Sequence, residues 1–533
     1  MRVTAVTRRG DFLSQMGRRS GDRGPTIYSH TPAKPPFSYC EAVNLKRSRG
    51  TFLKSQLVVA ALRKTYLRTG DVLMRIRFCR MLTATLLGPF FFTLGQFARA
   101  EANLIHNPDF KVSGEKGLPT EWSRWGPLLD STACQMQLVP GGLWMDGGKE
   151  PFAVGGVWQE LQGIRGEQAY AIDALCRTEN LQSPYRSVIV RMSWTKAGRP
   201  LPEETMMLVR GLTSAEGKLQ FRDVLVAPRE ADAGRLSLEL KWPQGGAVCW
   251  EHVNVRATTT PLPRKVKIGT VYLRPSNSTP ERNMDLFCEQ IDAAGRLGLD
   301  IVCLPEKFTK IGTTKDDAHL AKPIPGPDTN RLGAAAKRNH LWVVASLSEL
   351  DSGRLYNTGV LLDRNGELKG KYRKVHLPLG EWKSGVIPGN EYPVFETDFG
   401  KVAIQVCYDW FFPEIAGIWG LKGVEIVFAP TWGTTFPDEP GRLDGGETVF
   451  RLRAFDNGIY LVPSVYDGNS MVINPLGRIL ASSKGQTGVF WCEVDLNQRE
   501  PTPDFGHWRA IVPRDRMPDT YGPLLSDPKE PAY

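Results

Sequence analysis

Three residues with reactive side chains each lie at or near the end of an apolar segment. Cys407 ends the run 402–407, Glu306 follows the run 300–305, and Lys374 lies in a segment of basic and apolar residues. Because α/β folds bring the carboxyl ends of their strands to one edge, such residues can meet there although they are far apart in the sequence. A cysteine that closes an apolar strand is more often a core residue than a nucleophile, so residue type alone leaves both interpretations open.

The local sequence favours chemistry at two of these positions. Glu306 follows Pro305 at the mouth of an apolar strand, where a half-buried carboxylate suits a general base. Cys407 is followed by Tyr-Asp-Trp-Phe-Phe-Pro-Glu, which places it at a strand-to-helix turn. Free backbone N–H groups at such a turn would lower the pKa of the thiol and could receive an oxyanion. Both features indicate nucleophilic attack on a carbonyl group.

Beyond residue 264 the sequence alternates between strand-like and helix-like segments, which predicts an α/β domain. The first predicted helix, 280–297, has Thr279 as its N-cap and Pro280 at its first position. Further helices are predicted at 328–339, 411–422 and 444–457. Strands are predicted at 266–273, 300–305, 341–347, 355–363, 402–406, 425–431 and 459–466.

Residues 101–260 predict a separate all-β sandwich domain. Predicted strands at 169–176, 187–194, 236–242 and 248–257 alternate with clusters of Gly, Pro and Asn. The opening Asn103-Leu-Ile-His-Asn-Pro-Asp-Phe110 resembles the start of galactose-binding-like jelly rolls, the fold of many carbohydrate-binding modules. Tryptophans in this region either fill the core, the preferred interpretation, or offer flat faces to sugar rings; they are Trp122, Trp125, Trp144, Trp158, Trp194, Trp242 and Trp250.

The N-terminal hundred residues predict a leader and a signal peptide. Residues 1–80 hold 17 Lys and Arg but only four acidic residues, so the formal charge of +10 comes from this stretch. The charge is scattered and forms no basic face, which argues against nucleic-acid binding. Within 74–100, basic residues precede the apolar run 81–97 and then Ala98-Arg99-Ala100. This order predicts cleavage after Ala100 and a secreted or periplasmic protein.

The apolar run is too short for a stable membrane span, which needs about 20 apolar residues. Since signal peptides begin at an initiator methionine, we expect the basic leader 1–73 to be a start-site artefact and Met74 to be the first residue. Seven of the nine cysteines follow Ala100, and an odd number leaves at least one free thiol in an oxidising compartment. Their wide spacing argues against a metal site.

Three ordered motifs resemble the carbon–nitrogen hydrolase (nitrilase) superfamily: Pro305-Glu306-Lys-Phe, Tyr372-Arg-Lys374-Val-His-Leu, and Cys407-Tyr-Asp-x-x-Phe-Pro-Glu. The likeness covers residues 264–525 and leaves 526–533 as a tail; shorter pieces such as Tyr356-Asn-Thr-Gly support it. The resemblance implies a four-layer αββα sandwich with a Glu306–Lys374–Cys407 triad. It also implies that Glu381 positions the substrate and Lys374, and that no cofactor is needed.

In this family the triad would cleave an amide-type bond through a covalent thioester. Cys407 would attack the carbonyl carbon, while Glu306 takes the thiol proton, delivers it to the leaving nitrogen and later activates water. Lys374 would stabilise the oxyanion together with backbone N–H groups near Tyr408 and Trp432. His376 matches a structural histidine of the family, so a Cys–His pair is not expected.

The residues after the nucleophile favour one branch of the family. Tyr408-Asp409 stands where nitrile-cleaving members usually carry Trp-Glu, which favours an amidase or an N-carbamoyl hydrolase of the β-ureidopropionase-like branch. The expected substrate is a small linear amide or N-carbamoyl compound, with nitriles as an alternative. A further alternative is a secreted glycan-binding protein with an inactive hydrolase scaffold, and a third is a sandwich that holds an active enzyme on a polysaccharide or cell wall.

The substrate and the oligomeric state are less well specified by the sequence. The expected pocket loops, 308–326 and 433–447, are rich in Thr, Asp, Pro and Gly, and this composition does not indicate a particular ligand. We expect a homodimer, because family members usually pair through the helices beside the nucleophile. The Pro-rich segment 498–533 is expected to lie over the neighbouring subunit.

Overall fold

The computed structural model describes residues 102–114, 117–202, 205–215, 217–433, 445–502 and 506–526. All of them belong to one compact unit, Thr93–Tyr533. The predicted leader, the signal peptide and its cleavage site lie outside the described residues. None of the described helices is long and apolar enough to cross a lipid bilayer.

The first half of the described chain forms two antiparallel sheets of six strands each. Strands of one sheet are β1 (Ser123–Trp125), β4 (Val154–Leu161), β11 (Ala233–Lys241), β6 (Val188–Lys196), β7 (Arg199–Pro200) and β8 (Met207–Leu208). Those of the other are β2 (Gln135–Val139), β3 (Gly142–Asp146), β12 (Ala247–Thr258), β5 (Ala169–Glu179), β10 (Lys218–Val226) and β9 (Gly211–Ala215). A four-residue helix, α1 (Pro184–Ser187), precedes β6.

One hydrophobic cluster joins these two sheets. Alternate residues of β11 and β5 point into it, which is the pattern of strands that bury one face. Trp122, Trp194 and Trp250 belong to this core. The other tryptophans of the region are only partly exposed, and Arg235 covers the ring of Trp158 with its guanidinium 3.8 Å from the ring centre. The likeness to galactose-binding-like domains stays a prediction.

The second half of the described chain contains two mixed sheets of six strands each. The first is built from β17 (Leu368–Arg373), β16 (Arg354–Leu362), β15 (Trp342–Asp351), β14 (Ile301–Cys303), β13 (Lys265–Tyr272) and β24 (Gly488–Asp495). The second is built from β18 (Phe395–Glu396), β19 (Lys401–Ile404), β20 (Ile426–Gly433), β21 (Tyr460–Asp467), β22 (Met471–Ile473) and β23 (Ile479–Ser482). β13, β14 and β15 are parallel, as are β19, β20 and β21.

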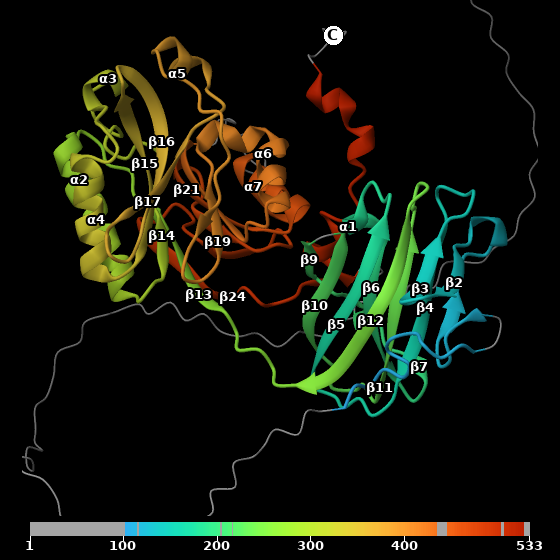
Figure 1. The fold of residues 1–533 in the computed structure, drawn as a ribbon. Helices are drawn as coiled ribbons and strands as arrows, with labels where there is room; N and C mark the ends of the chain where they lie inside the picture. The colour runs from blue at the N-terminus through green and yellow to red at the C-terminus, as the bar shows by residue number, and fades with distance from the viewer. Residues whose placement is uncertain are drawn as a thin grey trace, which may run out of the picture. The chain divides into compact units, whose positions relative to one another are not determined.

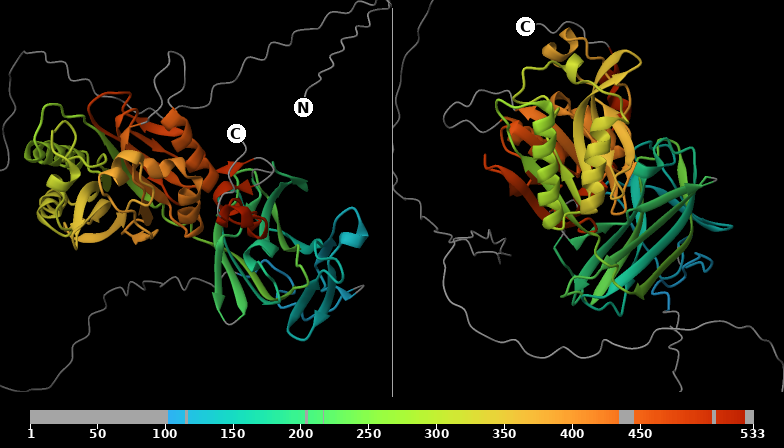
Figure 2. Two further views of the ribbon diagram at one scale, coloured as in Figure 1. Left: turned by 90° about the horizontal axis from the view of Figure 1, so that it is seen from above. Right: turned by 90° about the vertical axis from the view of Figure 1, so that its left-hand side faces the viewer.

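Helices cover the outer face of each mixed sheet, so the predicted αββα order is confirmed (Figure 1). α2 (Pro280–Arg296) and α4 (Pro327–Asn339) lie side by side over the first sheet (Figure 2, right). α6 (Pro413–Leu421) and α7 (Gly445–Asn457) lie over the second. The hydroxyl of Thr279 accepts a hydrogen bond from the backbone N–H of Arg282, which confirms it as the N-cap of α2. Shorter helical segments are α3 (Asp317–Leu320), α5 (Leu379–Lys383), α8 (Trp508–Ile511) and η4 (Cys407–Phe411).

The inner faces of the two mixed sheets form a single apolar core. Its residues come mainly from β14, β15, β19, β20 and β21. The sheets approach closely at Gly359 of β16, where an added Cβ would come within 2.6 Å of Cγ2 of Ile404 on β19. The carboxyl ends of β14, β19 and β20 are thereby held beside one another, which is the arrangement that α/β sites require.

The C-terminal segment contacts the β-sandwich of its own chain, and its expected position over a neighbouring subunit stays a prediction. Arg514 donates a hydrogen bond to the carbonyl oxygen of Val188 (3.0 Å), and Lys241 pairs with Asp515 (2.6 Å). Ala510 and Ile511 share a small apolar cluster with residues of β6 and β8. Of the seven cysteines among the described residues, Cys134, Cys176, Cys249 and Cys303 are buried.

The close approach of the two sheets at Gly359 predicts that a larger residue there destabilises the protein. Gly359→Ala should lower the free energy of unfolding by about 1–3 kcal/mol, because the new methyl group forces the two sheets apart. Chemical denaturation followed by tryptophan fluorescence measures the change. Gly522→Ala is the matched control, since a Cβ there meets nothing within 4 Å. Equal stability of both variants would contradict the close packing of the sheets.

Candidate active site

Glu306 enters the site from the carboxyl end of β14. The backbone N–H of Leu304 still pairs with Val344 of β15, and the chain then turns at Lys307, whose φ of 43° lies in the left-handed region. The Glu306 side chain is only 3% exposed, so it is more deeply buried than the sequence indicated. A left-handed conformation in a non-glycine residue is strained and is often found at functional sites.

Cys407 lies on a second strained turn. It follows β19, begins η4 and has a φ of 45°. Asp409 holds this turn, because its carboxylate accepts hydrogen bonds from the backbone N–H groups of Val406 (2.9 Å) and His376 (3.0 Å) and from the hydroxyl of Tyr372 (2.8 Å). One buried carboxylate therefore connects the nucleophile turn to the segment that carries Lys374.

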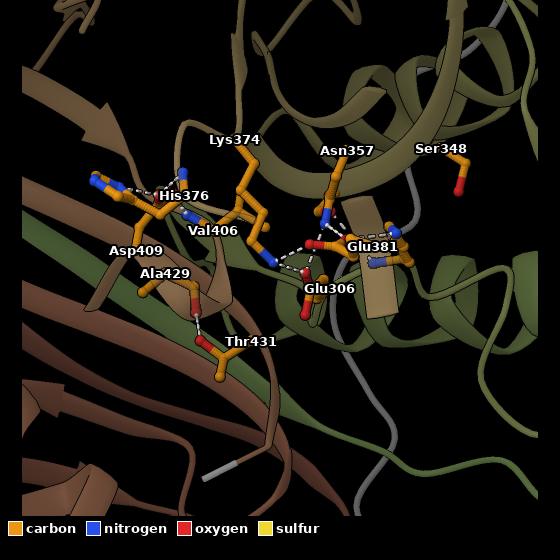
Figure 3. A network of polar contacts seen from close by, with 12 residues as sticks. Glu306, Ser348, Asn357, Lys374, His376, Glu381, Val406, Asp409, Ala429 and Thr431 are labelled. Atoms are coloured by element: carbon orange, nitrogen blue, oxygen red, sulfur yellow. Dashed lines mark hydrogen bonds and ion pairs between the residues drawn. The ribbon is translucent and has the colours of Figure 1, made fainter. Parts of the chain in front are cut away.

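Lys374 joins the two glutamates that the sequence placed in the site. Its ammonium group lies 2.9 Å from Oε1 of Glu306 and 2.7 Å from Oε2 of Glu381 (Figure 3). The side-chain amide of Asn357 donates to the same two carboxylates, at 2.6 Å and 2.8 Å. The backbone N–H of Lys374 also pairs with the carbonyl oxygen of Asn357, which fixes the lysine on the extension of β17.

A second buried lysine belongs to the same network, and the sequence reasoning did not identify it. The ammonium group of Lys307 lies 2.6 Å from Oε1 of Glu381 and 3.1 Å from Oδ1 of Asp317. Lys310 neutralises the other oxygen of Asp317 at 2.7 Å. Two features of the sequence could have identified Lys307 and Asn357 as site residues. Lys307 is adjacent to Glu306, and Asn357 belongs to the Tyr-Asn-Thr-Gly motif. Asp317 belongs to no motif and could not have been identified in this way.

The charges in the site fix its protonation state. Burial, followed by the negative charge of Glu306, raises the pKa of the Cys407 thiol to about 12, although Lys374 and the backbone N–H of Trp432 act in the opposite direction. The expected lowering of this pKa is therefore wrong. Burial alone would raise the pKa of Glu381, but the ammonium groups of Lys374 and Lys307 outweigh it and lower that pKa. The resting site therefore holds a neutral thiol, and the carboxylate of Glu381 is held in its charged form.

The thiol of Cys407 nevertheless lies near the groups that could activate it. The Glu306 carboxylate and the backbone N–H of Trp432 both act on its pKa, in opposite directions. The ring of Trp432 packs edge-on against that of Tyr466, with 5.5 Å between the ring centres. The Tyr408 ring packs against Phe411, with 4.9 Å between the centres. Glu306, Lys374, Glu381 and Cys407 are thus brought together, with Trp432 beside the sulfur.

His376 does not act on the thiol. Its ring stacks on Phe412, with 3.8 Å between the ring centres, and its Nδ1 lies 3.2 Å from the Asp409 carboxylate. Within the part of the chain that the structure describes, no cluster of three or more His, Cys, Asp or Glu residues could hold a metal ion. Of the expected pocket loop 433–447, residues 434–444 lie outside the described residues.

Comparisons with known proteins show which family the chain resembles. Residues 267–504 match the carbon–nitrogen hydrolase family. The chain is 32% identical over 233 residues to omega-amidase NIT2 of Xenopus tropicalis, covering 40% of this chain and 83% of the relative. It is 30% identical over 258 residues to human omega-amidase NIT2 (44% and 92%) and 31% identical over 263 residues to the probable nitrilase C965.09 of Schizosaccharomyces pombe (47% and 88%).

Among solved structures, a carbon–nitrogen hydrolase from Helicobacter pylori G27 aligns with a TM-score of 0.44 and 22% identity, covering 50% of this chain and 99% of that protein. The family match spans both mixed sheets and includes all the residues of the network. The sequence relatives are covered over most of their own length. This chain belongs to the carbon–nitrogen hydrolase (nitrilase) family.

Proposed function

We propose that this protein is an amidase that hydrolyses a small linear amide through a thioester at Cys407. The observation that carries the proposal is the position of one carboxylate, Glu306, which pairs with the ammonium group of Lys374 and is close enough to the thiol of Cys407 to raise its pKa. A general base, a nucleophile and a cationic oxyanion donor then surround one position. Two of the compared relatives are named omega-amidases, which supports an amide as the substrate.

Because the thiol is neutral at rest, it has to lose its proton during the attack, and Glu306 is the group that accepts this proton. As the sulfur bonds to the carbonyl carbon, the thiol proton moves to the Glu306 carboxylate, so no free thiolate has to accumulate in a buried site. Lys374 and the backbone N–H of Trp432 are placed to stabilise the negative charge on the carbonyl oxygen. Glu306 then passes its proton to the leaving nitrogen, and ammonia or an amine departs.

Hydrolysis of the thioester completes the cycle and restores the starting state. Glu306 takes a proton from water as the water oxygen attacks the carbonyl carbon; the C–S bond then breaks, the acid is released, and Glu306 returns the proton to the sulfur of Cys407. Glu381 and Asn357 keep Lys374 in place throughout, because both contact it or its partner carboxylate within 2.9 Å. The net reaction converts an amide and water into a carboxylic acid and ammonia.

Amides are the first proposed substrate class, because two of the compared relatives are named omega-amidases. N-carbamoyl compounds remain a proposed second class, since their carbonyl carbon is attacked in the same way. We further propose secretion, a homodimer and a glycan or cell-wall contact through the β-sandwich; none of these is required for the chemistry.

Removal of the nucleophile should abolish activity without unfolding the protein. Cys407→Ala should reduce ammonia release from short amides to the uncatalysed rate, and Glu306→Gln should lower kcat by about 10²–10⁴-fold. Cys288→Ala, on the outer helix α2, is the matched control and should keep full activity. A coupled ammonia assay measures the activity of the wild type and of each variant. Activity that persists in Cys407→Ala would refute the mechanism. An inactive wild type would indicate a scaffold without catalysis.

The raised pKa of Cys407 predicts an unusual pH dependence of alkylation. Iodoacetamide incorporation at Cys407 should increase steadily from pH 7 to 10 without a plateau, because the thiol has a pKa of about 12. In Glu306→Gln the curve should move to lower pH, since the carboxylate charge that raises this pKa is gone. Peptide mass spectrometry measures the rates. A wild-type plateau below pH 8 would show a thiolate at rest.

Lys307 should extend activity toward acidic pH. Glu381 works as a carboxylate, and Lys307 helps to lower its pKa, so activity persists until the pH falls through that lowered value. Lys307→Met should raise the pKa of Glu381 and move the acidic limb of kcat/KM to higher pH, while Lys310 still pairs with Asp317. The exposed Lys315→Met is the control. An unchanged acidic limb in Lys307→Met would remove Lys307 from the mechanism.

A further inference from the structure

A cavity of about 390 Å³ lies away from the catalytic network, at the C-terminal ends of α6 and α7. Three arginines, Arg210, Arg509 and Arg516, line it, and no acidic residue does. Tyr185 and Asn457 add polar groups, and glycines of α6 leave room where side chains would otherwise fill the space. The volume is within the range of small-molecule sites.

The acids near this cavity are already engaged with other cations. Glu425 pairs with Arg264 at 2.5 Å and lies 4.0 Å from Arg509, so it is shared. Asp223 pairs with Arg499 at 2.5 Å and accepts a hydrogen bond from the backbone N–H of Arg210. Asp515 pairs with Lys241. Among the described residues, no acidic side chain forms an ion pair with the guanidinium of Arg210 or Arg516.

The concentration of positive charge is costly when the cavity holds only water. Burial, followed by repulsion from Arg499 and Arg509, lowers the pKa of Arg210 to about 10, although Asp223 and Glu425 act in the opposite direction. Guanidinium groups bind carboxylate and phosphate oxygens in bidentate geometry, and such hydrogen bonds are stronger than those between neutral groups. An oxyanion in the cavity would therefore supply the missing negative charge. The C-terminal carbonyl groups of the two helices supply only partial negative charge.

We propose that this cavity is a second binding site, specific for a small molecule that carries a phosphate or a carboxylate group. Its walls come from four places in the chain: the β-sandwich through Tyr185 and Arg210, α6, the end of α7, and the C-terminal segment 509–516. An anion bound there would hold these elements together. Since α6 begins at Pro413, shortly after Cys407, the ligand would also stabilise the helix that follows the nucleophile turn.

Thermal unfolding of the full chain tests the site. Inorganic phosphate and citrate are titrated separately at constant ionic strength against sodium chloride, and either should raise Tm by about 2–4 °C near saturation. A response to phosphate alone identifies the phosphate group as the ligand chemistry, and a response to citrate alone identifies the carboxylate. Equal Tm values in phosphate, citrate and chloride would overturn the proposal.

Two single variants distinguish this cavity from general surface effects. Arg210→Gln and Arg516→Gln should each remove most of the anion-dependent rise in Tm. Without anion, Arg210→Gln should unfold at the same temperature as the wild type or higher, because an uncompensated cation is gone. Arg256→Gln, an exposed arginine of the β-sandwich, is the control and should keep the full response. If both cavity variants keep it as well, the anion binds elsewhere and the proposal fails.

Discussion

The buried ion network around Lys374 is the constraint on which the site depends. Four charged side chains, Glu306, Lys374, Glu381 and Lys307, are largely withdrawn from water beyond the ends of β14 and β17 of the first mixed sheet. Burying a charge is costly unless it is paired and hydrogen-bonded. Each member therefore has to keep its partner, which restricts every side chain to one position. The same restriction supplies the preorganised electrostatics that catalysis requires.

Asp409 connects this network to the nucleophile without taking part in the chemistry. Its carboxylate is completely buried and accepts hydrogen bonds from both the η4 turn and the segment beyond β17. The left-handed backbone at Cys407 is strained, and the hydrogen bonds of Asp409 are what offset that strain. Placement of the sulfur relative to the lysine thus depends on a residue that would be mistaken for a catalytic acid by type alone.

The sequence predicted the order of elements and named four residues, Glu306, Lys374, Glu381 and Cys407, that the structure brings together, because both leave local patterns. The alternation of strands and helices, the cap at Thr279 and the three motifs all depend on residues close together in the chain. Properties that depend on distant residues were missed or misjudged. Lys307 gains its role only through Asp317 and Glu381, and the pKa of Cys407 follows from burial and from Glu306, neither of which a turn motif reveals.

The protonated state of the nucleophile has a consequence for chemical durability. Peroxides and disulfides react with thiolates and hardly with thiols. A cysteine that gives up its proton only to a neighbouring carboxylate during attack is therefore shielded from oxidants between turnovers. The deeply buried thiols of the β-sandwich, whose pKa values are also raised by burial, share this inertness. The sulfur of Cys407 can in this way stay unreactive between turnovers and become a nucleophile only when a substrate arrives.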